Sequence, residues 1–164
     1  MSAESTVLPL KRPRDYRAIL WGGLIAGTMD ITAACIDSAF SGRSPVWVFQ
    51  SVASGVLGAG SYKGGFGSAL LGLFIHFAIA FFWCSVYFVA SQNLGFLRTQ
   101  PIIFGLLYGV VVYLCMYGVV LRLTFHRNFL RPLSGVIVAV VIHMICIGLP
   151  ISLAVWRFAK TSNR

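Results

Sequence analysis

Long apolar runs alternate with short polar segments along this chain. Four of the runs reach the ~20 residues that a helix needs to cross a bilayer core. They cover Ala18–Phe40, Gly65–Ala90, Ile102–Leu121 and Leu133–Trp156. The pattern predicts an all-α fold, an integral membrane four-helix bundle, with a single membrane domain over residues 16–160.

A fifth apolar stretch, Val46–Gly58, has only 13 residues. As a helix it would extend ~20 Å, which is short of a ~30 Å hydrocarbon core. Ser44 can cap its start, with Pro45 at the first helical position. Its polar residues fall on one side and its apolar residues on the other, so we expect a short interfacial or re-entrant helix between spans one and two.

Residues 1–15 are polar and contain proline, which predicts a disordered basic N-terminal tail. Basic residues before an apolar run also occur in signal peptides. The run that follows Arg17 exceeds the ~7–15 residues of a signal-peptide core, and Asp30 interrupts it. We therefore expect this run to be retained as the first span.

The composition supports a membrane protein. Charged residues make up 10% of the chain, against about 25% in soluble domains. The net charge is +9, and every Lys and Arg lies outside the four apolar runs or at their ends. Basic residues in these places bind lipid headgroups. We therefore expect the lipid bilayer as a partner and no nucleic acid.

The distribution of basic residues predicts the orientation. If both termini are inside, eight Lys and Arg are inside and five are outside, which favours a cytoplasmic location of the N- and C-termini. The inner eight are Lys11, Arg12, Arg14, Arg17, Arg98, Arg157, Lys160 and Arg164; the outer five are Arg43, Lys63, Arg122, Arg127 and Arg131.

Ionisable side chains inside the runs are the candidates for function, because such groups are costly in hydrocarbon. Four polar side chains stand 8 to 11 residues from the outer end of their run, about 12–17 Å deep: Asp30, His76, Tyr113 and His143. They predict one polar layer near the middle of the bilayer. Asp37 lies one heptad outward from Asp30, on the same helix face.

Small residues accompany this layer and predict where helices pack closely. They are Gly23 and Gly27 in the first run, Gly72 in the second, and Gly105 and Gly109 in the third. Pro150 in the fourth run removes a hydrogen bond to the Cys146 carbonyl. In an up-down bundle the second and fourth spans are diagonal, so both histidines can point to the centre.

Three interpretations of the layer follow. The first is a non-enzymatic membrane protein in which the layer organises the bundle and a site for a protein partner or lipid. The second is a small oligomeric transporter or proton-coupled channel that uses Asp30, Asp37, His76 and His143. The third, with less support, is a haem protein with two axial histidines.

Other chemistry has no support in the sequence. The four cysteines lie one in each span, at different depths, and no Cys-x-x-Cys occurs. We interpret them as small apolar core residues. The motifs of serine hydrolases, zinc proteases and phosphate-binding loops are missing. We therefore expect no catalytic residue, no metal site and no cofactor.

The two halves of the chain show a weak internal repeat. Gly23–Gly27 matches Gly105–Gly109, and Ile75–Phe77 matches Ile142–Met144. The offsets differ by about the length of the extra short helix, so one hypothesis is two tandem helical hairpins with an insertion in the first.

The combination of motifs resembles a family of small uncharacterised bacterial four-span inner-membrane proteins. The resemblance covers Ile19–Arg157 and implies a bacterial inner-membrane location and no substrate, cofactor or catalytic residue. Separately, we expect a homo-oligomer or a membrane protein partner. It is carried by Gly23–Gly27 with Asp30, Ser44-Pro45 with Gln50–Gly55, Leu71-Gly72 with His76, Gly105–Gly109, and Ile142–Met144 with Gly148–Pro150.

The predicted orientation can be tested by cysteine labelling from each side of the membrane. We expect Arg43→Cys to react only from outside and Arg98→Cys only from inside, because one span separates them. Replacing the four native cysteines by alanine provides the background. Labelling of both positions from the same side would contradict the orientation.

Overall fold

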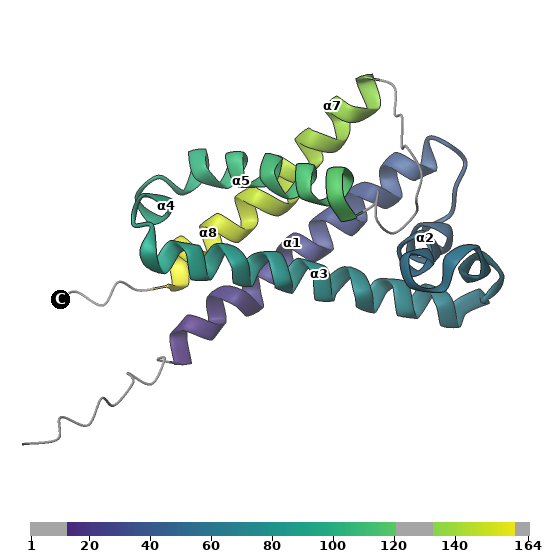
Figure 1. Ribbon diagram of the computed structural model, residues 1–164, viewed down its shortest axis with the longest axis horizontal. Helices are drawn as coiled ribbons and strands as arrows, with labels where there is room; N and C mark the ends of the chain where they lie inside the picture. The colour runs from purple at the N-terminus through teal and green to yellow at the C-terminus, as the bar shows by residue number, and fades with distance from the viewer. Residues whose placement is uncertain (1–12, 121–132, 160–164) are drawn as a thin grey trace, which may run out of the picture.

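The computed structural model describes residues 13–120 and 133–159. In this part of the chain 92% of the residues are helical and none lies in a strand, which confirms the predicted all-α class. Four stretches of helix are long and apolar enough to cross a membrane. The chain is therefore a membrane protein, and Figure 1 shows the arrangement of its helices.

The four spans agree with the predicted runs to within a few residues: Tyr16–Ala39, Gly65–Asn93, Pro101–Val119 and Leu133–Phe158. The elements, in chain order, are α1 (Pro13–Ala39), α2 (Pro45–Leu57), the 3₁₀-helix η1 (Gly58–Lys63), α3 (Gly65–Asn93), α4 (Phe96–Thr99), α5 (Pro101–Cys115), the π-helix η2 (Met116–Val120), α7 (Leu133–Ile142), the π-helix η3 (His143–Gly148) and α8 (Leu149–Phe158).

Two helix starts show the role of proline. α2 begins at Pro45 as predicted, and the Ser44 hydroxyl accepts a hydrogen bond of 3.2 Å from the Trp47 amide. α1 begins at Pro13, so the prediction of a disordered tail is wrong for residues 13–15. Proline suits the first helical position because its missing N–H has no partner there. The predicted tail residues 1–12, the predicted span end at Leu121 and the loop 124–132 lie outside the described residues.

α1 and the last span form the centre of the bundle. α1 packs against α3 and also against α8 and η3, and α5 packs against η3 and α8. Figure 1 shows α1 and the last span running diagonally side by side, with α3 and α5 crossing them. Side chains link α3 to α5: the Tyr108 hydroxyl donates a hydrogen bond of 2.7 Å to the Trp83 carbonyl. Within the described residues α3 and α5 are not among the helix pairs whose backbones pack closely, so the bundle is less tightly closed there than in a regular up-down bundle.

The outer surface of the spans carries large apolar side chains. Phe74 is 73% exposed, and Phe82 and Ile102 are each 59% exposed. Many of the buried residues, by contrast, are small, including Ala18, Ala26 and Ala53 in the first two helices. In water this distribution would leave an unusually large apolar surface. In a bilayer the same surface faces acyl chains, and the small residues let the helices approach closely.

Predicted packing glycines join α1 to α3. A Cβ atom built at Gly23 meets the ring of Phe81, and one built at Gly27 lies 2.8 Å from the ring of Phe77. The aromatic rings of α3 therefore lie flush against the backbone of α1. Gly22, which the sequence analysis did not select, is equally enclosed: a Cβ there lies 2.6 Å from the Cys84 sulfur and 3.2 Å from the Ala154 Cβ.

A second set of glycines joins α5 to the last span. A Cβ at Gly109 lies 2.5 Å from the His143 carbonyl oxygen, and one at Gly105 meets Ser152. Gly148 in turn faces the backbones of Gly105 and Gly109. The prediction that Gly105 and Gly109 pack against another helix is thus in agreement with the structure, and Gly148 completes the contact.

The last span widens into a π-helix, η3, directly before Pro150 in the first turn of α8. Proline cannot donate to the carbonyl four residues earlier, and its ring needs space there. A short π-helical segment provides that space without ending the helix. Pro150 is buried, so this irregular turn lies inside the bundle.

α2 turns its polar side toward the protein. Gln50 and Ser54 are buried, whereas Val56 is 71% exposed. The Gln50 amide donates a hydrogen bond of 2.9 Å to the Gly65 carbonyl and lies 3.4 Å from the Ser68 hydroxyl. A helix that contacts lipid needs internal partners for its polar groups, and this arrangement supplies them.

Gly72 provides a test of the contact between α2 and α3. A Cβ built at Gly72 overlaps the carbonyl oxygen of Phe49, and the backbone there cannot move aside without separating the helices. We expect Gly72→Ala to lower the free energy of unfolding by about 1–3 kcal/mol, measured by SDS titration in mixed micelles.

Gly67→Ala, in the first turn of the same helix, is the matched control, because a Cβ at Gly67 meets nothing within 4 Å. It should be neutral, or stabilising by up to about 1 kcal/mol through higher helix propensity. Equal destabilisation by both substitutions would show that close packing at Gly72 is not the cause.

Candidate functional site

Asp30 lies in the middle of α1 and is half-buried. Its carboxylate is within electrostatic range of two imidazoles, that of His143 more strongly and that of His76 less so. The Cys146 thiol of η3 also lies within its range. The predicted convergence of Asp30 with both histidines is therefore present in the structure, and these three residues form what we call the Asp–His cluster.

Within the described residues, no hydrogen bond or ion pair involves the Asp30 carboxylate. A carboxylate inside a bundle normally has such a partner. Asp30 therefore differs from His76 and His143, which both bond to backbone carbonyls.

His76 connects α3 to α1. Its Nε2 atom lies 2.9 Å from the Gly27 carbonyl oxygen. A carbonyl only accepts, so the imidazole donates and Nε2 carries the hydrogen. Nδ1 is the nitrogen left to accept a proton. Gly27 contributes to this contact in two ways: its carbonyl accepts the hydrogen bond, and its missing side chain leaves room for the ring of Phe77 of α3.

His143 is buried in η3 and, unlike His76, bonds to the backbone through Nδ1. Its Nδ1 atom donates a hydrogen bond of 2.8 Å to the Ala139 carbonyl of the same span. Nε2 is therefore the nitrogen left to accept a proton. The two imidazoles are thus held by the same kind of partner, a backbone carbonyl, but through different nitrogens.

Two tyrosines of the third span enclose His143. Tyr113 of α5 meets it edge-on, with ring centroids 5.5 Å apart at an interplanar angle of 82°. Tyr117 of η2 does so at 5.8 Å and 71°. The two tyrosine rings stack on each other at 4.6 Å. The predicted member Tyr113 therefore joins the layer through its ring.

Asp37 lies apart from the cluster. It is exposed near the end of α1, about 10 Å along the axis from Asp30. No contact between Asp37 and the cluster occurs in the part of the chain that the structure describes. The structure therefore brings together Asp30, His76, Tyr113 and His143, and leaves Asp37 nearer the end of the span.

Sequence reasoning missed two neighbours of the cluster. Tyr117 stands one turn after Tyr113, and this spacing placed it on the same face. Cys146 was placed on the face of His143 but interpreted as an apolar core residue, and its closeness to Asp30 was not predicted. The π-helical winding of η2 and η3, which carry these two residues, has no comparable signal in the sequence.

The cluster combines one carboxylate with two imidazoles, each with one nitrogen free of backbone contacts. Such groups can hold or exchange a proton. Among the described residues, no group of three or more His, Cys, Asp or Glu side chains is arranged to hold a metal ion. All four cysteines, Cys35, Cys84, Cys115 and Cys146, are free thiols.

Comparison with models of known protein families, with curated proteins and with solved structures found no match to this chain.

The bond between His76 and Gly27 can be tested with two substitutions. His76→Leu removes the donor, and we expect the free energy of unfolding to fall by about 0.6 kcal/mol, and by up to about 1.7 kcal/mol. His76→Gln places an amide nitrogen near the position of Nε2 and should retain most of the stability. SDS unfolding in mixed micelles measures both, with Phe74→Leu on the exposed side of α3 as control. An equal loss in the Leu and Gln variants would contradict the bond.

Proposed function

We propose that this protein is a non-enzymatic integral membrane protein in which the layer of Asp30, His76, Tyr113 and His143 organises the packing of the four spans. One observation carries the proposal. The polar and aromatic contacts of this layer run between helices or onto backbone carbonyls: His76 bonds to α1, and Tyr113 packs on His143 across the α5–η3 contact.

The glycine contacts support this role. Gly27 provides the carbonyl that His76 uses, and Gly109 packs against the His143 carbonyl. Each histidine therefore lies at a glycine contact between two spans: Gly27 meets side chains of α3, and Gly109 meets the backbone at His143. The His76 bond fixes the register of α3 on α1, because a shift of one turn would leave its N–H without an acceptor in hydrocarbon. His143 bonds within its own span and contributes to the contact with α5 through its ring and backbone.

The location follows from charge and resemblance. We propose a bacterial inner membrane, with the N- and C-termini on the cytoplasmic side, as the positive-inside rule and the resemblance to four-span inner-membrane proteins suggest. The partners we propose are the lipid bilayer and a second copy or another membrane protein. We propose no role for nucleic acid, because the basic residues border the spans.

A second candidate function is proton-coupled transport by an oligomer. Asp30 favours it, because a carboxylate that only organised packing would be expected to hold a hydrogen bond, and none is present in the described part of the molecule. The free Nδ1 of His76 and the free Nε2 of His143 add two proton acceptors in its range. A single bundle leaves little room for a solute, so transport would require several copies.

Proton flux into liposomes distinguishes the two functions. Asp30→Asn, which removes the charge of the carboxylate and nearly keeps its shape, is the variant used to test any flux. If the layer only organises packing, liposomes that contain the unaltered protein show no proton flux above empty liposomes. In that case we expect His143→Leu to lower the free energy of unfolding by about 0.5–1.5 kcal/mol, because it removes the ring contacts with Tyr113 and Tyr117. A pH-sensitive dye inside the liposomes measures the flux, and SDS titration measures the stability.

Flux in the unaltered protein that Asp30→Asn abolishes at unchanged stability would overturn the packing proposal in favour of transport. Asp37→Asn is the matched control, because it removes a carboxylate on the same helix outside the cluster. Equal loss of flux in both variants would instead indicate an effect of overall charge.

A further inference from the structure

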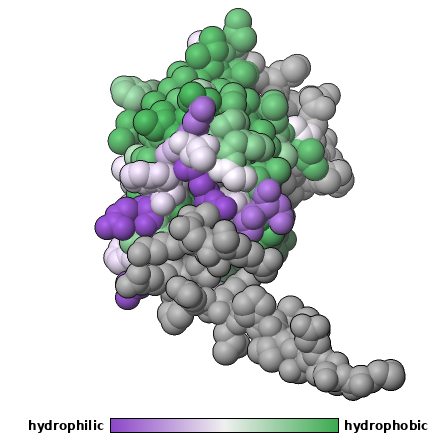
Figure 2. Space-filling view, turned by 90° about the vertical axis from the view of Figure 1, so that its left-hand side faces the viewer, coloured by the Kyte–Doolittle hydropathy of each residue, from purple (hydrophilic) through white to green (hydrophobic). Residues whose placement is uncertain are grey.

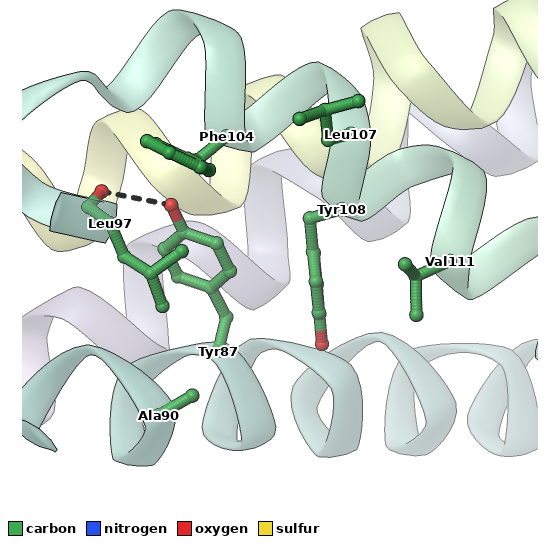
Figure 3. Close-up of a pocket in the computed structure, with 7 residues that line it drawn as sticks. All are labelled: Tyr87, Ala90, Leu97, Phe104, Leu107, Tyr108 and Val111. Carbon is green, nitrogen blue, oxygen red and sulfur yellow. Dashed lines mark hydrogen bonds between the residues drawn. The ribbon is translucent and has the colours of Figure 1, made fainter. Parts of the chain in front are cut away.

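A groove lies on the loosely closed side of the bundle, between α3 and α5. Figure 3 shows its lining, and its volume is about 200 Å³. Tyr87 and Ala90 come from α3, Leu97 comes from the α4 region, and Tyr108 and Val111 come from α5. The groove is remote from the Asp–His cluster along the chain and shares no residue with it.

The surface of the groove is apolar although two tyrosines line it. The Tyr87 hydroxyl donates a hydrogen bond of 3.0 Å to the Leu97 carbonyl, shown as the dashed line in Figure 3. The Tyr108 hydroxyl donates to the Trp83 carbonyl at 2.7 Å. Both hydroxyls thus already bond to the backbone, and the two rings, 4.8 Å apart, present carbon atoms to the groove. A polar solute finds no partner here, whereas an alkyl chain does.

The groove opens toward the lipid. Leu107 and Val111 on its rim are 54% and 49% exposed. α3 and α5 belong to two membrane spans, so the medium beside the groove is hydrocarbon. If the groove were empty, the residues that line it would lose dispersion contacts, so we expect an acyl chain of a neighbouring lipid to fill it. The volume suits a segment of one acyl chain and is below the ~300–1,000 Å³ of sites for drug-sized ligands.

Positive charge lies at the end of the bundle toward which the groove runs. Leu97 lines the groove, and the next residue, Arg98, is in the last turn of α4. α4 packs against α8, which carries Arg157 in its last turn, and Arg17 is exposed near the start of α1. Figure 2 looks onto this end and shows hydrophilic residues gathered beside an otherwise hydrophobic surface. An anionic headgroup is the charge complement of this end.

We propose that this groove is a binding site for an anionic phospholipid, with one acyl chain lying against the rings of Tyr87 and Tyr108 and the phosphate at Arg98. The apolar lining binds the acyl chain, and Arg98 distinguishes an anionic headgroup from a zwitterionic one. This site is separate from the general contact of the spans with the bilayer, because it predicts a preference for one class of lipid at one place.

Fluorescence quenching by brominated lipids tests the proposal. Trp83 is the reporter, because its ring meets that of Tyr108 edge-on with centroids 6.4 Å apart. Trp21, Trp47 and Trp156 are replaced by Phe. The full chain is reconstituted in phosphatidylcholine vesicles that contain brominated phosphatidylglycerol or, separately, brominated phosphatidylcholine. We expect the anionic lipid to be preferred about five-fold, the effect of one basic residue at a membrane surface.

Two pairs of variants locate the site. Ala90→Phe fills the groove, and Ala78→Phe is its control on an exposed position of α3. Arg98→Gln removes the charge at the groove, and Arg43→Gln removes an exposed arginine from the loop between α1 and α2. The preference should disappear in Ala90→Phe and Arg98→Gln and persist in both controls.

Equal quenching of the unaltered reporter by both lipids would overturn the proposal, and this result needs no variant to fold. A preference that survives Ala90→Phe or Arg98→Gln, or that is lost in the controls, would also overturn it. Absence of quenching by either lipid would show that a second copy or another protein covers the groove.

Discussion

Close approach of helix backbones at glycine determines how this bundle is built. At Gly72, Gly109 and Gly148, any side chain would meet the backbone of a neighbouring helix. In a bilayer, lipid chains compete equally well for apolar side chains, so helices associate through close packing and polar contacts instead of hydrophobic burial. The bare backbone surfaces meet this condition, and the large apolar side chains remain on the outside.

The same arrangement occurs in both halves of the molecule. In the first half, Gly27 of α1 meets α3 and accepts the hydrogen bond of His76. In the second half, Gly109 of α5 meets the carbonyl of His143 in η3. A helix with a Gly-x-x-x-Gly motif thus packs twice on a helix that carries a histidine. The two contacts differ in detail, because the His76 bond joins two helices and the His143 bond stays within one, so the hypothesis of two tandem hairpins stays a prediction.

Much of the fold and part of the site could be predicted because helix geometry is regular. A constant rise of 1.5 Å per residue places residues at equal distance from a span end at equal depth, and this argument identified Asp30, His76 and His143. It did not find the π-helical turns: η3 depends on how Pro150 and Gly148 are accommodated beside α5, and η2 has no comparable signal in the sequence. The loose side between α3 and α5 was also missed, since apolar periodicity does not report which spans touch. The inward orientation of the polar side of α2 could not be predicted either, because it depends on where Gly65 and Ser68 lie in space.

The two imidazoles bind the backbone through opposite edges of the ring, His76 through Nε2 and His143 through Nδ1. A proton taken up by either ring arrives at the nitrogen that holds no carbonyl. Charging the layer therefore leaves both backbone contacts intact. Of the two contacts only that of His76 joins two spans, so one edge of this ring aligns α3 with α1 while the nitrogen on its opposite edge holds no backbone partner.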